Sequence, residues 1–407
     1  MGNQRRIKAT KKTPLTILNN LEKPFKLSKK VYLCRVMAST IYFHIPFCKQ
    51  ICSYCDFYRT AALKELPAVV DKMCEEIKDR ANYLTDKQIR TIYFGGGTPS
   101  LLDPSQVKKL LDAARSLFDC SQVEEITLEA NPDDLTEGYL QAIRSVGINR
   151  LSIGIQSFND DCLKLMNRRH TASEAITAVR RAQQAGFDNI TIDLIFGVPG
   201  FGGEVLEKSI DQALALGVQH ISAYLLTIEE RTRFGRMAEK GELKEISDTT
   251  AEEEFLLIHK RLTDAGMEHY EVSNYALQGY RARHNSHYWD GTPYLGIGPA
   301  AHSFDGRSRQ WNPASVVRYL QGETPERETL GTEEMREEFL MTRLRTADGF
   351  SIDDFRRQFG QNSTEKLLCA LEKFSDEGLI IRTEDKIRIP SEKFLLSDHI
   401  IGSLFDL

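Results

Sequence analysis

Three cysteines lie close together near the start of the chain, as Cys48, Cys52 and Cys55 in the run Cys-Lys-Gln-Ile-Cys-Ser-Tyr-Cys. This C-x3-C-x2-C spacing places three thiolates on one loop, which can bind three irons of a [4Fe–4S] cluster. The fourth iron then has no protein ligand, whereas clusters that only transfer electrons normally have a fourth cysteine. An open iron can be chelated by the amino and carboxylate groups of S-adenosylmethionine. The cluster can then pass an electron to the sulfonium and release a 5′-deoxyadenosyl radical.

Two other interpretations of these cysteines are unrelated buried thiols and a zinc knuckle. Zinc usually has four ligands in paired C-x2-C spacing, and no second pair lies nearby, so the pattern favours the cluster. The other five cysteines show no disulfide framework; they are Cys34, Cys74, Cys120, Cys162 and Cys369. An oxygen-sensitive cluster also indicates a reducing cytoplasm.

The composition is that of an ordinary soluble globular protein, with 41% hydrophobic and 27% charged residues. A chain of 407 residues is long enough for one large domain and a smaller one. No apolar run approaches the ~20 residues that span a bilayer, so we expect no transmembrane helix.

The first 36 residues hold ten Lys and Arg against one Glu, a net charge of +9. Because the whole chain has a net charge of −5, the remaining residues carry −14. This segment lacks the apolar core of a secretory signal. It is interpreted as a basic arm over residues 1–37, either dispensable or created by a start assigned upstream of Met37. A peripheral contact with an anionic membrane is the alternative, because Leu15, Ile17, Leu18 and Leu21 lie between its lysines.

Short β-rich runs alternate with amphipathic segments of helical period through residues 38–275. The expected strands are Ile41–Ile45, Thr91–Phe94, Glu125–Ala130, Arg150–Ile155, Asn189–Phe196 and His220–Leu225. The expected helices are Leu66–Tyr83, Pro104–Leu117, Gly138–Val146, Ala172–Ala185 and Leu206–Leu216. This alternation implies parallel βαβ units. Six units suggest a curved, incompletely closed barrel, although spacing alone also permits an open doubly wound sheet.

The pattern changes after about Tyr275. Residues 276–330 form a connecting segment rich in glycine, proline and aromatic residues. Residues 331–407 are predicted to form three helices and a small hairpin, an order typical of a winged-helix α+β domain. This domain has 11 Lys and Arg against 16 Asp and Glu, and a nucleic-acid surface should be basic. We therefore expect it to close the barrel or contact a protein, with no nucleic-acid partner.

Several polar or glycine residues follow the expected strands directly. Gly96, Gly97 and Thr98 belong to the run Gly-Gly-Gly-Thr-Pro after the second strand, where glycines let the backbone approach a ligand closely. Glu129 ends the third strand, where a carboxylate can bind ribose hydroxyls or the cationic end of a cofactor. Asp193 stands in an apolar strand, which is costly unless it is paired or bound to a ligand. The alternative for such residues is an internal salt bridge, for Asp193 with Arg168.

The run from Tyr42 through Cys48 to Phe57 resembles the radical-SAM proteins related to anaerobic coproporphyrinogen III oxidase. The resemblance extends from about Ile41 to the C-terminus and implies a partial (β/α)6 barrel. It also implies S-adenosylmethionine contacts at Tyr42, Tyr54, Gly96, Gly97, Thr98, Glu129, Gln156, Arg168 and Asp193. Tyr54 takes the place of a phenylalanine in the oxidase.

One position distinguishes the oxidase from the heme-chaperone branch of this family. The oxidase has C-x3-C-x2-C-x-C, whereas Phe57 stands here at the last cysteine's position. The resemblance therefore implies a heme chaperone that binds a [4Fe–4S] cluster, S-adenosylmethionine and haem, and transfers haem to an acceptor such as a respiratory protein. The alternative is a radical enzyme of the oxidase type, with a radical methyltransferase as a third idea. The sequence leaves a homodimer open.

A second motif, His284-Asn-Ser-His-Tyr288-Trp289, matches the H-N-x-x-Y-W of the chaperone branch. Histidine is the commonest axial ligand of haem iron, and Tyr288 and Trp289 offer a flat apolar wall. An aromatic loop in which His284 is merely hydrogen-bonded fits the residues as well. The resemblance favours haem at His284, with His287 as a nearby alternative ligand and His302 as a more distant one.

Overall fold

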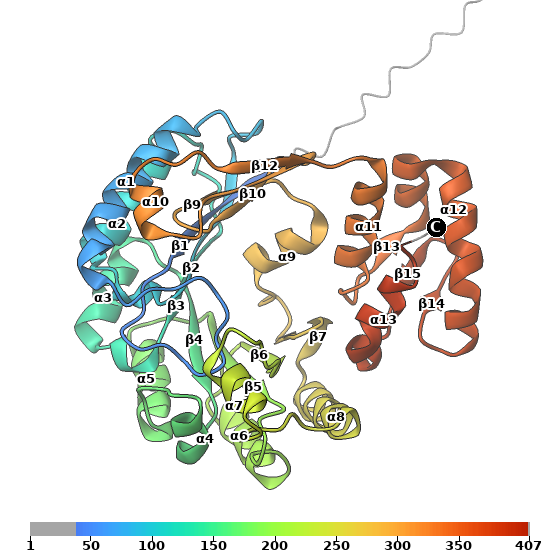
Figure 1. The fold of residues 1–407 in the computed structure, drawn as a ribbon, viewed down its shortest axis with the longest axis horizontal. Coiled ribbons are helices and arrows are strands. Elements are labelled where there is room, and N and C mark those ends of the chain that lie inside the picture. The colour runs from blue at the N-terminus through green and yellow to red at the C-terminus, as the bar shows by residue number, and fades with distance from the viewer. Residues whose placement is uncertain (1–37, 406–407) are drawn as a thin grey trace, which may run out of the picture. The chain divides into compact units, whose positions relative to one another are not determined.

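The computed structural model describes residues 38–405, so the predicted basic arm over 1–37 lies outside the described residues. Most of the strands join one twelve-stranded sheet (Figure 1). They are β1 (Ser39–Ile45), β2 (Ile89–Gly96), β3 (Glu125–Ala130), β4 (Arg150–Gln156), β5 (Ile190–Phe196), β6 (His220–Leu225), β7 (Glu268–Glu271), β8 (Asn274–Ala276), β9 (Tyr294–Ile297), β10 (His302–Phe304), β11 (Ser308–Trp311) and β12 (Glu326–Thr329). Their order in the sheet is β12-β11-β10-β9-β1-β2-β3-β4-β5-β6-β8-β7.

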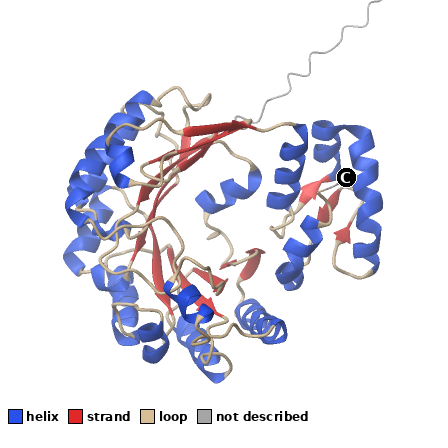
Figure 2. Ribbon diagram, in the orientation of Figure 1, coloured by secondary structure: helices blue, strands red, loops and turns tan. Residues whose placement is uncertain are grey.

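Strands β1 to β6 pair in sequence order, each parallel to the next. Crossovers of one hand that always advance in the same direction place their helices on the same face of a sheet. Figure 2 shows the helices on the convex side of the curved sheet. The partial barrel expected from the sequence is therefore confirmed, and the doubly wound alternative, whose strand order reverses, is wrong.

The helices associated with the barrel are α1 (Leu66–Asp79), α2 (Pro104–Arg115), α3 (Glu137–Val146), α4 (Asp160–Leu165), α5 (Ala172–Gln184), α6 (Glu204–Ala215), α7 (Arg233–Glu239) and α8 (Asp248–Asp264). Local signals set their ends: Thr136 caps the start of α3 by accepting from the Tyr139 amide, and Gly147 ends it in a left-handed conformation. Short 3-10 turns occur at Leu63–Glu65, Pro99–Leu101 and Pro132–Asp134. Nowhere in residues 38–405 does a helix combine the length and apolarity needed to cross a membrane.

Residues 276–330 add strands to the barrel sheet. Strand β9 runs parallel to β1, and β10, β11 and β12 continue the sheet as antiparallel strands. The segment also forms α9 (Arg283–Asp290) and α10 (Val316–Leu320). Helix α9 lies on the concave side of the sheet (Figure 1).

The C-terminal part contains α11 (Thr332–Arg343), β13 (Phe350–Ser351), α12 (Ile352–Asp376), β14 (Ile381–Arg382), β15 (Lys386–Arg388), a 3-10 segment (Ser391–Leu396) and α13 (Ser397–Gly402). Gly360 interrupts α12 with a φ of 85°, which gives the expected three helices, and β14 and β15 form the expected hairpin. Strand β13 completes a three-stranded sheet. Backbone hydrogen bonds join this part to β7 and the turn after it, from Val272 N to Arg345 O (3.0 Å) and from Ala347 N to Tyr270 O (2.9 Å).

Candidate functional site

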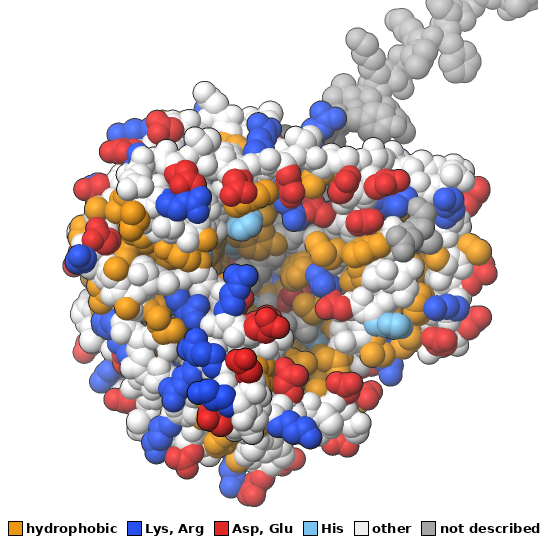
Figure 3. Space-filling view, viewed as in Figure 1, with side chains coloured by type: hydrophobic (Ala, Val, Ile, Leu, Met, Phe, Trp, Pro, Cys, Tyr) orange, Lys and Arg blue, Asp and Glu red, His pale blue; other side chains and the backbone are white. Residues whose placement is uncertain are grey.

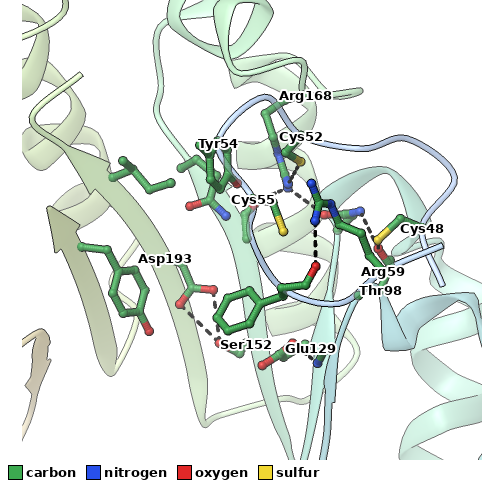
Figure 4. A pocket seen from close by; sticks show the side chains of 18 of the residues that line it. Cys48, Cys52, Tyr54, Cys55, Arg59, Thr98, Glu129, Ser152, Arg168 and Asp193 are labelled. Atoms are coloured by element: carbon green, nitrogen blue, oxygen red, sulfur yellow. Dashed lines mark hydrogen bonds between the residues drawn. The ribbon is translucent and has the colours of Figure 1, made fainter. Parts of the chain in front are cut away.

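A pocket of about 510 Å³ opens at the carboxyl ends of β1 to β6. Parallel strands bring the residues that follow them to one edge of the sheet, which is why side chains from six βα units meet here. The lining includes Cys48, Cys52, Tyr54, Cys55, Phe57, Arg59, Gly96, Gly97, Thr98, Glu129, Asn131, Ser152, Gly154, Gln156, Arg168, Asp193, Tyr224, Leu225, Leu226 and Thr227. Figure 4 shows the labelled cysteines on one side of the pocket and the labelled carboxylates on the other.

The three cysteines are free thiols on the loop after β1. Thr98 Oγ1 donates to Cys48 Sγ at 3.5 Å, and Arg168 Nη1 donates to Cys52 Sγ at 3.2 Å. Burial raises the pKa of the Cys48 and Cys55 thiols. A buried thiolate is costly, and bound iron would offset this cost by coordinating the anionic form.

The cysteine loop is held against the segment that follows α4. The Ser53 amide donates to Met166 O and the Phe234 amide to Ser53 O, both at 2.9 Å. Asn167 Nδ2 donates to Ile51 O at 2.7 Å. Asn167 adopts a left-handed conformation with φ 58°, which an asparagine tolerates better than most residues. These contacts hold the cysteine loop against α7 and the segment that follows α4.

The glycine run after β2 closes the pocket beside Cys48. Gly96 has a φ of 110°, and a Cβ added there would lie 2.7 Å from the His44 ring. A Cβ on Gly97 would lie 2.8 Å from Phe47 O and 2.9 Å from Ile45 O. Neither position accepts a side chain, so backbone of the glycine turn can approach a ligand directly.

Two carboxylates face the pocket without an ion-pair partner in residues 38–405. Glu129 accepts hydrogen bonds from Tyr93 OH (2.8 Å) and Gly96 N (3.1 Å), while Asp193 accepts from Ser152 Oγ (3.3 Å). Burial raises the pKa of Glu129 to about 7 and that of Asp193 to about 6. A cationic ligand would offset this cost by favouring the ionised forms.

The internal salt bridge considered for Asp193 does not form. Arg168 instead donates to Asn131 Oδ1 (2.7 Å) and Gly154 O (2.5 Å), in addition to Cys52 Sγ. This leaves Asp193 available to a ligand and makes Arg168 a link between the cysteine loop and strand β4.

Of the three remaining residues predicted to contact the cofactor, two line the pocket and one does not. Gln156 lines the pocket with a φ of 71°, a conformation that a residue other than glycine seldom adopts away from functional sites. Tyr54 lines the pocket as well. Tyr42 is absent from the lining; its hydroxyl bonds His44 Nδ1 at 3.1 Å, and its ring stacks on Tyr93.

Sequence reasoning missed several residues that line the pocket. Asn131 follows β3, and Tyr224 lies near the end of β6. Their place at the carboxyl ends of these strands could have indicated that they line the pocket. Ser152 lies two residues before Gly154 on β4, and alternation along the strand puts it on the pocket face. Arg59 donates to Phe57 O at 2.7 Å and had no signal of its own.

His284 is the second residue of α9 and is completely buried. Its Nδ1 bonds Thr91 Oγ1 at 2.8 Å, its Nε2 bonds Tyr288 OH at 3.0 Å, and its ring stacks on Tyr93. The backbone amide of His284 donates to Glu125 Oε1 at 3.0 Å. Both ring nitrogens of His284 are therefore hydrogen-bonded to protein groups in this conformation. That His284 binds haem iron stays a prediction.

The two aromatic residues of the motif point in different directions. Tyr288 packs edge-on against Tyr294 at 4.9 Å, whereas the Trp289 side chain lies by the buried Glu271 carboxylate, where it partly offsets the rise in the pKa of Glu271 caused by burial. Neighbouring residues of a helix point about 100° apart, so these rings do not form one wall. His287 Nδ1 lies 3.3 Å from an oxygen of Asp290.

The residues of the pocket fit the cluster and the cofactor that the sequence suggests. In residues 38–405, no three His, Cys, Asp or Glu side chains converge as ligands of a single metal ion. A cubane cluster does not require this, because each thiolate binds a different iron. The unpaired Glu129 and Asp193 suit the cationic S-adenosylmethionine.

Comparison with known proteins gives two family models and a set of long matches. Residues 42–213 match the radical SAM superfamily, and residues 330–396 match the HemN C-terminal domain. The chain is 34% identical over 370 residues to the heme chaperone HemW of Bacillus subtilis, covering 89% of this chain and 98% of that one. It is 33% identical to HemW of Lactococcus lactis, covering 89% and 96%. The chain belongs to the HemW family of radical-SAM proteins.

The Escherichia coli HemW matches a shorter stretch, with 36% identity over 269 residues, 65% of this chain and 69% of that one. Among solved structures, coproporphyrinogen III oxidase (HemN) from Escherichia coli superposes with a TM-score of 0.77 and 22% identity, covering 91% of this chain and 92% of that one. This chain therefore has the same fold as that oxidase.

Proposed function

We propose that this protein is a heme chaperone that holds a [4Fe–4S] cluster on Cys48, Cys52 and Cys55, binds S-adenosylmethionine in the adjoining pocket, and passes haem to an acceptor protein in the reducing cytoplasm. The observation that carries the proposal is the match to a curated heme chaperone over 98% of that chaperone's length. The cysteine loop and its pocket support it, because one pocket holds three thiols and, on its other side, two carboxylates without an ion-pair partner in residues 38–405.

Different residues of the pocket would contact different parts of S-adenosylmethionine. Backbone of Gly96 and Gly97 can meet the methionyl end beside Cys48, while Glu129 and Asp193 face the opposite side of the pocket. Their carboxylates would ionise next to a cationic ligand, since burial holds the pKa values at about 7 and about 6. A cluster held on the three cysteines would supply an electron to the sulfonium of the bound cofactor.

The second candidate function is an enzyme of the coproporphyrinogen oxidase type, which the shared fold favours. Phe57 is the observation that weighs against it. This residue lines the pocket where the oxidase pattern has a cysteine, and its side chain is 71% exposed.

The deciding experiment is anaerobic reconstitution of iron and sulfide, followed by two assays on the same preparation. A heme chaperone should bind one equivalent of haem and transfer it to an apo-acceptor, without decarboxylating coproporphyrinogen III. Turnover to protoporphyrinogen IX with S-adenosylmethionine and reductant would instead establish the enzyme. Absence of stoichiometric haem binding would refute the chaperone proposal.

A further inference from the structure

One histidine on the barrel wall has unoccupied ring nitrogens. The chain has nine histidines, all within the described residues, and the exposed ones are His302 and His399. The His302 ring nitrogens have no hydrogen-bond partner in residues 38–405, and the ring stacks on Trp311 with centroids 6.0 Å apart and an angle of 23°. His399 has no such aromatic neighbour. His302 alone therefore combines a free imidazole with an aromatic support.

His302 lies on the concave face of the sheet. Ser303, the next residue, points to the convex side, where its hydroxyl accepts from Arg80, the residue directly after α1. Side chains alternate along a strand, so His302 and Phe304 share the opposite face. Trp311 pairs directly with His302 across the β10–β11 ladder.

Aromatic side chains continue this face toward α9. Phe304 pairs with Tyr294 of β9, with ring centroids 6.2 Å apart. Tyr294 in turn meets Tyr288 of α9. The face therefore joins His302 to the motif that suggested haem. Figure 3 shows a hollow with hydrophobic side chains on both sides, in the view of Figure 1.

We propose that the His302 imidazole is an axial ligand of a metalloporphyrin whose ring lies on the aromatic face formed by Tyr294, Phe304 and Trp311. The proposal rests on the proposed heme-chaperone function and names the group that would hold the iron. The ring nitrogen would donate its lone pair to ferric or ferrous iron, displacing a water ligand, with no change in oxidation state.

The contrast with His284 makes this assignment specific. To reach iron, His284 would have to give up a hydrogen bond to Thr91 or Tyr288 and leave a completely buried position. His302 loses no protein hydrogen bond. Partial burial and the nearby Arg309 also lower the pKa of His302, which keeps the imidazole neutral as metal ligation requires. Such an accessible ligand suits a cargo that must be released to an acceptor.

The test is anaerobic titration of the full-length chain with haemin, followed by Soret absorbance and electron paramagnetic resonance. We expect His302→Ala to weaken haemin binding at least tenfold and to lose the histidine-ligated spectrum. Free imidazole should restore that spectrum. His399→Ala is the matched control, because it removes the other exposed histidine, and it should bind haemin like the original chain. His284→Ala should retain the histidine-ligated spectrum.

The outcomes separate the two proposals. If the original chain takes up no stoichiometric haemin, both the proposed function and the ligand assignment fail. If it binds haemin and His302→Ala matches His399→Ala, only the assignment fails. Trp311→Ala tests for another occupant: if it changes the sedimentation coefficient while haemin affinity stays constant, the face binds a second copy of the chain and the assignment is overturned.

Discussion

Replacing Glu129 with glutamine should stabilise the protein at alkaline pH in the absence of cluster and cofactor. Burial raises the pKa of this carboxyl from 4.5 to about 7. An acid with a raised pKa takes up a proton on folding, so the protein loses stability as the pH rises from 4.5 through 7. The shift corresponds to about 3 kcal/mol above pH 7, at ~1.4 kcal/mol per unit.

The measurable effect should be smaller than this figure. The pocket admits water to one side of the carboxyl group, which reduces the cost of ionisation. Glutamine keeps one acceptor for Gly96 N but changes the bond to Tyr93, at a cost of about 1 kcal/mol. We therefore expect the free energy of unfolding of Glu129→Gln, relative to that of the original chain, to rise by about 2 kcal/mol between pH 5 and pH 8. The cost at Tyr93 is the same at every pH and does not enter this difference.

Urea unfolding of the metal-free protein at pH 5, 6, 7 and 8 measures this difference. Glu252→Gln is the control, because Glu252 is exposed on α8. The same Glu129→Gln variant, once reconstituted, should bind S-adenosylmethionine at least tenfold more weakly if the carboxylate faces its positive charge. Parallel pH profiles for the original chain and Glu129→Gln would show that Glu129 stays ionised in the folded protein, which would refute the reasoning.

Three further predictions concern the cluster and the reaction. Cys48→Ser, Cys52→Ser and Cys55→Ser should each lose most of the bound iron and the brown absorption, and Cys369→Ser should keep both; loss in Cys369→Ser would contradict a three-ligand cluster. Asn167→Val should lower iron content several-fold, because it strains a left-handed position and removes the bond to the cysteine loop; unchanged iron content and cluster resonance would show that the loop needs no such clamp. The reconstituted chain should make no protoporphyrinogen IX from coproporphyrinogen III by chromatographic assay, and clear product would overturn the chaperone proposal.

The barrel strands were predictable because each is a continuous apolar run. β1, for example, is buried along nearly its whole length, as expected for a parallel strand covered on both faces. The cysteine loop and the glycine turn were predictable because their signals are local. The strands of 276–330 were not predicted, since runs of three or four residues carry no detectable period.

The surroundings of individual site residues could not be read from the sequence. His284 bonds Thr91, which is 193 positions earlier in the chain, and no local pattern reports such a partner. The same holds for Arg168, whose partners Cys52 and Asn131 come from two other loops. Long-range pairing decides whether a side chain is free or occupied, and only the fold supplies it.

The way α9 begins has a consequence for the order of folding. Its eight residues are too few to form a stable helix alone, and no side chain of its own caps the first turn. Glu125, at the start of β3, accepts from the amides of Arg283 and His284 instead. This contact joins residues about 160 positions apart, so we expect it to form later than the local contacts within each βα unit. The H-N-x-x-Y-W segment therefore becomes helical late, so a nascent or damaged chain with an unfinished barrel would not present the motif in its native form.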